Sequence, residues 1–386
     1  MYYIRRAQPE DQDILLKMAR TVHFINLPPD KDLISERIRR SRASFRGAVT
    51  GETPDFDTSV KGVHRESPIF MFCLVDSTTG NALGTSSIIA HMGGPGNPNI
   101  ALELRKREFF SQDLQSGTSH ITAKLVLDET GPTEIGGLIL GPSFRNHPEK
   151  LGKQLSLVRF HYMGLHRDQF ADMVIAEMMA PITPDGHNTF WEYFGRRFIN
   201  LSYTEADKFC AHSREFMTSL LPREEIYLSL LPAEARALVG KVGPETVPAR
   251  KLLEALGFKY TNRVDPFDAG PNLEAATDDI GLVKSTRRAV FSGVCTAQQA
   301  HGRAFVSTED DDGAFRAVFA PVQLGDDGRV ALPREYADVL ELEPGRRLGY
   351  TPVESKAKSA RKPKADAAAN GAAHASKSSK RTKSRK

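Results

Sequence analysis

A strand that ends in Gly-Pro and leads into a helix is the clearest feature that could bind a ligand. TEIGGLILGPSFR is apolar, and apolar residues recur at helical spacing in the following KLGKQLSLVRFHYMGL. The first N–H groups of such a helix lack partners and suit a phosphate or pyrophosphate. Arg145, Lys150 and Lys153 add positive charge there. Gly152 could also serve only to relieve crowding, and the spacing leaves both roles open.

Two carboxylates follow later in the chain, Asp265 and Asp268 in VDPFDAGP. They have the charge needed for a guanidinium group, because an arginine side chain and a carboxylate form a bidentate pair. The same spacing fits a turn held by Asx hydrogen bonds. The sequence therefore leaves a ligand role and a turn role open.

Histidines and cysteines offer weaker signals. His147 adjoins the expected phosphate loop, where it could assist a ligand or simply be exposed. His212 follows Cys210 by two residues, but no third residue orients them as a nucleophile pair. Cys73 and Cys295 form no C-x-x-C pair with Cys210, which fits a reduced compartment and argues against a zinc ribbon. We expect three buried cysteines and no metal.

The elements that must position these residues can be read from the periodicity. YYIRRAQPEDQDILLKMA predicts strand, loop and helix, 69–90 predicts a hairpin, and DMVIAEMM predicts a buried strand. FWEYFGRRF and ARKLLEALGF predict short helices that each end near a Gly followed by an aromatic residue. This similarity indicates two related halves.

The second of these helices lies within VGPETVPARKLLEALGFKY. Thr246 is a plausible N-cap, Pro248 falls in the first turn, Gly257 ends the helix and Phe258 supplies an apolar contact beyond it. Gly243 lies just before the helix and is followed by a proline. We therefore expect a defined turn there.

The C-terminal part has a different composition. Short β-rich segments with Asp-Gly and Pro-Gly turns predict a small β module at 282–354. Residues 355–386 contain eleven Lys or Arg and one Asp, a formal charge of +10, so the rest of this +4 chain carries −6. The tail has no large apolar residue, which predicts disorder. It could bind nucleic acid or another polyanion, or only aid solubility.

Length and composition bound the class of protein. With 386 residues and 40% hydrophobic content, the chain has room for two or three domains. No run reaches the ~18 apolar residues of a membrane helix. MYYIRRAQPEDQD lacks the apolar region of a signal peptide, so we expect a cytoplasmic protein without membrane contact.

The order of these segments resembles the GNAT N-acyltransferase fold, and the first ~280 residues are similar to the arginine N-succinyltransferase family. The resemblance is carried by TEIGGLILGPSFR, FADMVIAEMM, FWEYFGRRFINLSYTEADKFC, FMTSLLPREEIYLSLLPAEARALVGKV, PARKLLEALGFKY and DPFDAGPNLEA. It implies an α/β, GNAT-like fold with parts at 1–200 and 201–281, followed by the module and the tail.

The family implies direct transfer of a succinyl group from succinyl-CoA to the α-amino group of arginine, without a covalent enzyme intermediate. The thioester carbonyl would meet a backbone N–H near Leu138, and the pyrophosphate would lie over the loop that starts at Arg145 and includes Gly152 and Lys153.

The resemblance also implies where the acyl acceptor, arginine, binds and how many chains associate. His23, in TVHFINLPPD, would lie between two helices where this fold contacts substrate, although a histidine without function is the other interpretation. Asp265 and Asp268 would bind arginine. A homodimer is implied.

The chain departs from the family pattern at three places. The family's proton-donor histidine corresponds to Gly243, and glycine cannot transfer a proton. In the phosphate loop, Glu149 opposes a phosphate and Gln154 is expected to crowd it. Met179 replaces an arginine that could meet a carboxylate.

Three hypotheses follow: the family reaction with other groups, an N-acyltransferase with another acyl-CoA or amine, or a degenerate binding or regulatory protein.

Overall fold

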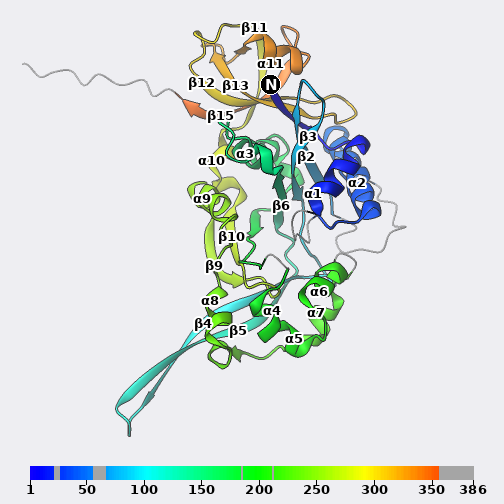
Figure 1. Cartoon of the computed structure of the whole chain (residues 1–386). Helices are drawn as coiled ribbons and strands as arrows, with labels where there is room; N and C mark the ends of the chain where they lie inside the picture. Colours follow the sequence, from blue (N-terminus) through cyan, green and yellow to red (C-terminus); the bar gives the residue numbers. More distant parts are fainter. Residues whose placement is uncertain (21–26, 55–66, 184–185, 211–212, 356–386) are drawn as a thin grey trace, which may run out of the picture. The chain divides into compact units, whose positions relative to one another are not determined.

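The computed structural model describes residues 1–20, 27–54, 67–183, 186–210 and 213–355 (Figure 1). Met1–Ser355 form one compact unit. His23, His212 and nearly all of the basic tail lie outside the described residues, so what was expected of them stays a prediction. Within the described part, no helix is long and apolar enough to cross a bilayer.

The described strands form one mixed sheet, and seven neighbours carry the site. In sheet order they are β1 (Tyr2–Arg6), β2 (Ile69–Asp76), β3 (Ala82–Ile89), β6 (Thr133–Leu140), β7 (Met173–Glu177), β10 (Pro271–Ala276) and β9 (Lys259–Val264). Only β6 and β7 pair in parallel among these seven. The predicted hairpin is confirmed, with Ile69 opposite Ile89. Its strands are buried on both faces, as the apolar run of β2 requires, and β3 buries Thr85, Ser86 and Ser87 as well.

Helices cover both faces of these strands. They are α1 (Gln12–Ala19), α2 (Lys31–Thr50), α3 (Leu151–Leu165), α9 (Val247–Ala255) and α10 (Gly281–Ser285). Leu15 of α1 and Ile38 of α2 pack with Met71 of β2 in one core. Phe70, whose side chain points the other way, packs with Val158 of α3 in another. The element order confirms the predicted GNAT-like acyltransferase fold.

Two insertions extend this unit. One is the long ribbon formed by β4 (Asn99–Ser111) and β5 (Ser116–Asp128), which pair along their whole length (Figure 1). The other, between β7 and α9, consists of α4 (Thr189–Tyr193), α5 (Gly195–Phe198), α6 (Tyr203–Cys210), α7 (Glu215–Leu220), β8 (Ile226–Tyr227) and α8 (Ala233–Leu238). Trp191 stacks on Phe267 in the core that they enclose. The division near residue 200 into related halves stays a prediction, and the described strands on either side of it share one sheet.

The predicted β-rich segment contains β11 (Arg287–Val294), β12 (Gly302–Thr308), β13 (Arg316–Leu324), β14 (Val330–Leu332), α11 (Arg334–Val339) and β15 (Arg347–Ser355). β13 pairs with β1, so this segment continues the sheet. His161 of α3 joins it through hydrogen bonds to the hydroxyl oxygens of Thr351 (2.6 Å) and Ser307 (2.7 Å). Short 3₁₀ turns lie at Pro9–Asp11, Pro142–Phe144, Arg167–Gln169, Leu228–Leu230 and Thr277–Asp279.

Candidate functional site

Strands β6 and β7 separate soon after they begin to pair. Their parallel ladder contains Thr133 with Val174 and Glu134 with Ile175, and no later pair among the described residues. Beyond it, β6 continues along β3 with an irregularity that includes Gly137, whose φ of +58° favours glycine. The β6 edge that faces β7 is therefore not paired with a strand after Glu134. Such an edge presents backbone groups to a ligand.

The loop from β6 to α3 forms an anion site by its backbone. Asn146 and Lys150 have positive φ values of 63° and 55°, and no side chain caps α3. The N–H groups of its first turn are therefore available to an anion. His147 holds the loop: its Nδ1 accepts the Glu149 N–H at 3.2 Å, and its Nε2 lies 3.4 Å from the Tyr2 hydroxyl.

The residues predicted to contact CoA lie along this edge and loop. Leu138 is half-buried on β6, and Lys153 is exposed in the first turn of α3. A Cβ added to Gly152 would meet only Leu140 at 3.7 Å, an ordinary contact. Crowding within the fold therefore does not require this glycine, which favours the ligand role. Arg145 is exposed, and its Nη1 lies 3.2 Å from the Glu245 carboxylate.

Gln154 does not crowd the loop as expected. Its side chain is buried, and its Nε2 donates to the Glu149 carbonyl at 2.7 Å. The amide therefore folds back and fastens the loop rather than projecting from it.

Gly243 lies just beyond the end of β7. Its N–H donates to the Met179 carbonyl at 3.0 Å, and an added Cβ would be 3.2 Å from the Ala180 carbonyl oxygen. The Arg145–Glu245 pair links the loop before α3 to this segment before α9. Gly243, the predicted counterpart of the family's histidine, thus lies two residues from the contact with the loop before α3, and it has no side chain to project.

A group of carboxylates lies on the sheet face that α1 and α2 cover. Glu134 is adjacent to Ile175 across the ladder, so Glu177, two residues further on β7, points the same way. Burial, with Glu134 and Asp265 nearby, raises the pKa of Glu177 to about 8. A hydrogen bond with Asn99 and the charge of Arg214 act in the opposite direction. These carboxylates therefore favour a bound cation.

Arginines lie beside these carboxylates. Burial and the nearby Arg40 and Arg214 lower the pKa of Arg37, on α2, to about 10, while Glu134 partly offsets this. Arg214 donates to the Asn99 Oδ1 at 3.4 Å. The cluster thus contains both signs of charge, which suits an amino acid with a cationic side chain.

The predicted pair Asp265 and Asp268 forms a turn. The Asp265 Oδ1 accepts the N–H groups of Phe267 (2.6 Å) and Asp268 (3.2 Å). Asp268 is buried and accepts from Ala180 at 2.8 Å and Gly270 at 2.7 Å. The turn interpretation holds for both residues, and Asp265 also contributes charge to the Glu177 cluster.

The cysteines are free and buried, as predicted. Burial raises the pKa of Cys210 to about 12, which opposes a thiolate nucleophile. Over the described ranges, no group of three or more His, Cys, Asp and Glu side chains could hold a metal ion.

Comparison with known proteins supports one family. A family model described as "Arginine N-succinyltransferase beta subunit" matches residues 2–282. Arginine N-succinyltransferases of Citrobacter koseri and Escherichia coli are each 31% identical over 353 residues, covering 90% of this chain and 96% of the relative. The chain belongs to the arginine N-succinyltransferase family.

A solved structure of this family has the same fold. The arginine/ornithine succinyltransferase subunit AI from Pseudomonas aeruginosa matches with a TM-score of 0.73 at 25% identity, over 91% of this chain and 98% of that chain. Alignments of this length extend beyond the 2–282 range into the β-rich segment. The arginine N-succinyltransferase relatives therefore share more than the acyltransferase unit.

Sequence reasoning missed three charged residues of the cluster on this sheet face: Glu134, Glu177 and Arg37. The first two interrupt otherwise apolar strands, TEIGGLIL and MVIAE, and this was a visible signal. Arg37 is one of many arginines in α2, so only the tertiary structure distinguishes it.

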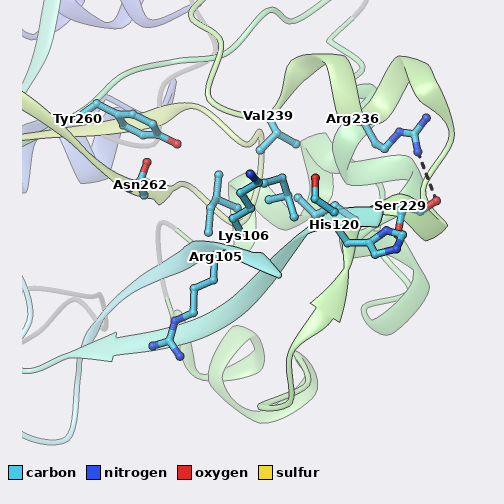
Figure 2. A pocket seen from close by; sticks show the side chains of 12 residues that line it. Arg105, Lys106, His120, Ser229, Arg236, Val239, Tyr260 and Asn262 are labelled. Carbon is cyan, nitrogen blue, oxygen red and sulfur yellow. Dashed lines mark hydrogen bonds between the residues drawn. The ribbon is translucent and has the colours of Figure 1, made fainter. Parts of the chain in front are cut away.

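A pocket of about 500 Å³ lies away from these residues (Figure 2). It is lined by β4, β5, β9 and the segment around Arg236, whose Nη1 donates to the Ser229 carbonyl at 3.4 Å. Lys106, His120 and Tyr260 also line it. None of the residues of the β6 edge or the carboxylate cluster takes part, so this pocket is not the site proposed below for the family reaction.

Proposed function

We propose that this protein transfers the succinyl group of succinyl-CoA to the α-amino group of arginine. One observation carries the proposal: the open β6 edge and a cluster of half-buried charges of both signs around the buried Glu134 meet where β6 and β7 separate. The edge suits a thioester, and the cluster suits a cationic amino acid. Membership of the arginine N-succinyltransferase family supports the same assignment.

The acyl donor binds along β6 and the start of α3. The pyrophosphate accepts hydrogen bonds from the first turn of α3, where Gly152 leaves room. Lys153 adds positive charge, and Arg145 exchanges Glu245 for phosphate. The thioester carbonyl accepts from the backbone near Leu138, which stabilises the oxyanion as it forms.

Arginine binds from the face that α1 and α2 cover. Its guanidinium pairs with Glu134 and Asp265, and its α-carboxylate pairs with Arg37 and Arg214. Both ends of the substrate then lie against charges of opposite sign. Asp268, next to Asp265, stays in the substrate proposal, and so does His23, which lies outside the described residues.

Glu177 accepts a proton from the α-ammonium group. An α-amino group has a pKa of about 8, close to that of Glu177, so the transfer has little cost. The nitrogen then attacks the thioester carbon, the tetrahedral intermediate gives the second nitrogen proton to water and collapses, and the carbon–sulfur bond breaks. CoA leaves as a thiolate and takes a proton from water, because Gly243 has none to give.

Thiol release with a panel of substrates tests the function. We expect the fastest release with succinyl-CoA and arginine, with ornithine as the second amine to compare. Slower release is expected with acetyl-CoA or with lysine. Preference for another donor or amine would favour the second hypothesis, and absence of release with every pair would favour a binding protein.

We also propose a homodimer and a polyanion-binding tail at 355–386. The β4–β5 ribbon exposes Phe109, Phe110 and Leu114, which supports contact with a second copy. Light scattering should give twice the 42.6 kDa chain mass, and a monomer at assay concentration would contradict the dimer. The +10 charge supports polyanion binding by the tail. The three free cysteines support a cytoplasmic location.

A further inference from the structure

Arg159 of α3 is a buried cation that no carboxylate neutralises in the part of the chain that the structure describes. It is 3% exposed. Its Nε donates to the Ser156 carbonyl at 3.0 Å, its Nη2 to the Ser156 hydroxyl at 2.8 Å and its Nη1 to the Gly136 carbonyl at 3.4 Å. Burial lowers the pKa of Arg159 to about 9. A buried charge in a folded protein usually has a partner of opposite sign.

Other buried arginines in this chain do have such partners. Arg5 forms two hydrogen bonds to the Asp11 carboxylate, at 2.6 Å and 2.8 Å. Arg6 lies 2.8 Å from the Asp312 carboxylate. Arg159 differs from both, because its bonds go only to neutral groups. Its position therefore suits an anion that arrives with a ligand.

Two contacts align α3 with β6. Gly152, at the start of the helix, faces Leu140, and Arg159 reaches Gly136. Seven helix residues rise roughly 10 Å and four strand residues span roughly 13 Å, so the two elements run side by side in opposite directions. Arg159 therefore lies at the end of β6 that is remote from the phosphate loop, close to where β7 separates.

The same alignment places Arg159 at the end of the acyl chain. Leu138, next to the proposed thioester carbonyl, lies between Leu140 and Gly136, and its distance to Gly136 along the strand is roughly 7 Å. The terminal carboxyl carbon of a succinyl group lies three bonds, roughly 4 Å, beyond the thioester carbon. The carboxylate oxygens extend further toward Arg159, and the guanidinium group extends from α3 toward them, which accounts for the remaining distance.

We propose that Arg159 binds the terminal carboxylate of the acyl donor and thereby selects a dicarboxylic acyl group. The inference rests on the proposed function and adds the residue that sets donor specificity. The family arginine that Met179 is predicted to replace would then not be needed, because Arg159 of α3 supplies the positive charge instead. The long Nη1 bond to Gly136 leaves this nitrogen free to turn toward a carboxylate.

The test compares kcat/KM for succinyl-CoA with kcat/KM for butyryl-CoA, which has the same chain length and no charge. In Arg159→Gln we expect a loss of roughly 100-fold with succinyl-CoA and little change with butyryl-CoA, because only the first donor loses a buried charge partner. Arg159→Lys keeps the charge and should keep part of the preference. Arg167→Gln, just after the same helix and paired with Asp172 and Asp278, is the matched control.

The outcomes separate this inference from the proposed function. An equal loss with both donors would show that Arg159 only supports the fold, and an unchanged ratio would also overturn the inference. Either result in a protein that still prefers succinyl-CoA leaves the proposed function intact. Wild-type protein without turnover of any acyl-CoA would overturn both. If Arg159→Gln unfolds early in a thermal scan, Arg159→Met, which also removes the charge, takes its place, and its two kcat/KM values are compared in the same way.

Discussion

Gly243 is the residue that we predict to stand where the family has its proton-donor histidine. It packs against Ala180, and the Arg145–Glu245 pair connects its segment to the loop before α3. We expect Gly243→His to raise kcat by about tenfold, since general acid catalysis is worth ~10² to 10⁴ where the geometry is ideal. The gain should depend on a group that titrates near pH 6.5.

Gly243→Ala is the matched control for this change. It adds the same Cβ beside the Ala180 carbonyl but cannot transfer a proton. Equal kcat values for the two variants over the pH range would contradict a missing acid at this position.

Glu177 gives a pH dependence with a defined direction. Its pKa of about 8 in the folded protein means that it accepts the substrate proton only as the pH rises, so kcat/KM for arginine should rise through pH 8. Glu177→Gln should lower kcat/KM by at least tenfold and remove that rise. Steady-state rates from pH 6 to 9.5 are the measurement, with the exposed Glu10→Gln as control. A Glu177→Gln variant with the wild-type profile would exclude the carboxylate as the base.

Glu177 also makes the stability of the fold depend on pH, and stability should fall where kcat/KM rises. Its folded-state pKa is above the unfolded value of about 4.3, so its contribution to stability is complete below pH 4.3 and is lost as the pH rises through 8. Bound arginine should offset this loss, because the cation favours the charged carboxylate.

At the scale of elements, helices with a clear apolar period and apolar strands were predictable, but the exposed β4–β5 ribbon was not. Helix α9 ends at Ala255, just before Gly257, which has a φ of +101°, and Phe258 is buried beyond it, as predicted. Thr246 is at the N-cap position, although its side chain makes no capping bond. The β4–β5 ribbon escaped prediction because its outer half, such as ELRKREFF, is exposed and does not alternate between apolar and polar residues.

The contact between α3 and the β-rich segment depends on a neutral histidine. Burial lowers the pKa of His161 to about 3, whereas an unfolded histidine titrates near 6.5. Its contribution to stability is complete above pH 6.5 and is lost as the pH falls from there toward 3, by up to about 1.4 kcal/mol per pH unit.

His161→Gln tests this contact. We expect it to lower the unfolding free energy at pH 8 by about 2 kcal/mol, through lost hydrogen bonds to Ser307 and Thr351. Between pH 6.5 and 4, its stability should fall less steeply than that of the wild type in urea denaturation. The exposed His301→Gln should keep the wild-type slope. A slope equal to that of the wild type in His161→Gln would assign the acid sensitivity to other groups.

At the scale of the whole molecule, the order of elements could be predicted, but their pairing could not. Nothing local in Ile4 or Ala317 indicates that they are opposite each other across more than 300 residues. The same holds for the site: Asp265 was noticed for its charge, but the cluster with Glu134 and Glu177 requires three segments to meet. Local patterns specify elements, whereas the site depends on the tertiary structure.

The basic tail gives the whole-molecule test. A chain that ends at Ser355 keeps every strand of the described sheet, so we expect an unchanged unfolding midpoint and unchanged kcat. Salt-dependent binding to heparin should disappear, because the remaining chain carries −6. Equal binding by the shortened chain in a titration at low salt would place the polyanion site elsewhere.

The most direct test of the proposed function identifies the product bond. The protein is incubated with succinyl-CoA and arginine labelled with ¹⁵N at the α-nitrogen, and products are followed by NMR and mass spectrometry. We expect one free CoA per succinylarginine, with the label in a new amide. Free CoA without an acylated amine, or a succinyl group on a guanidinium nitrogen, would contradict the proposed reaction.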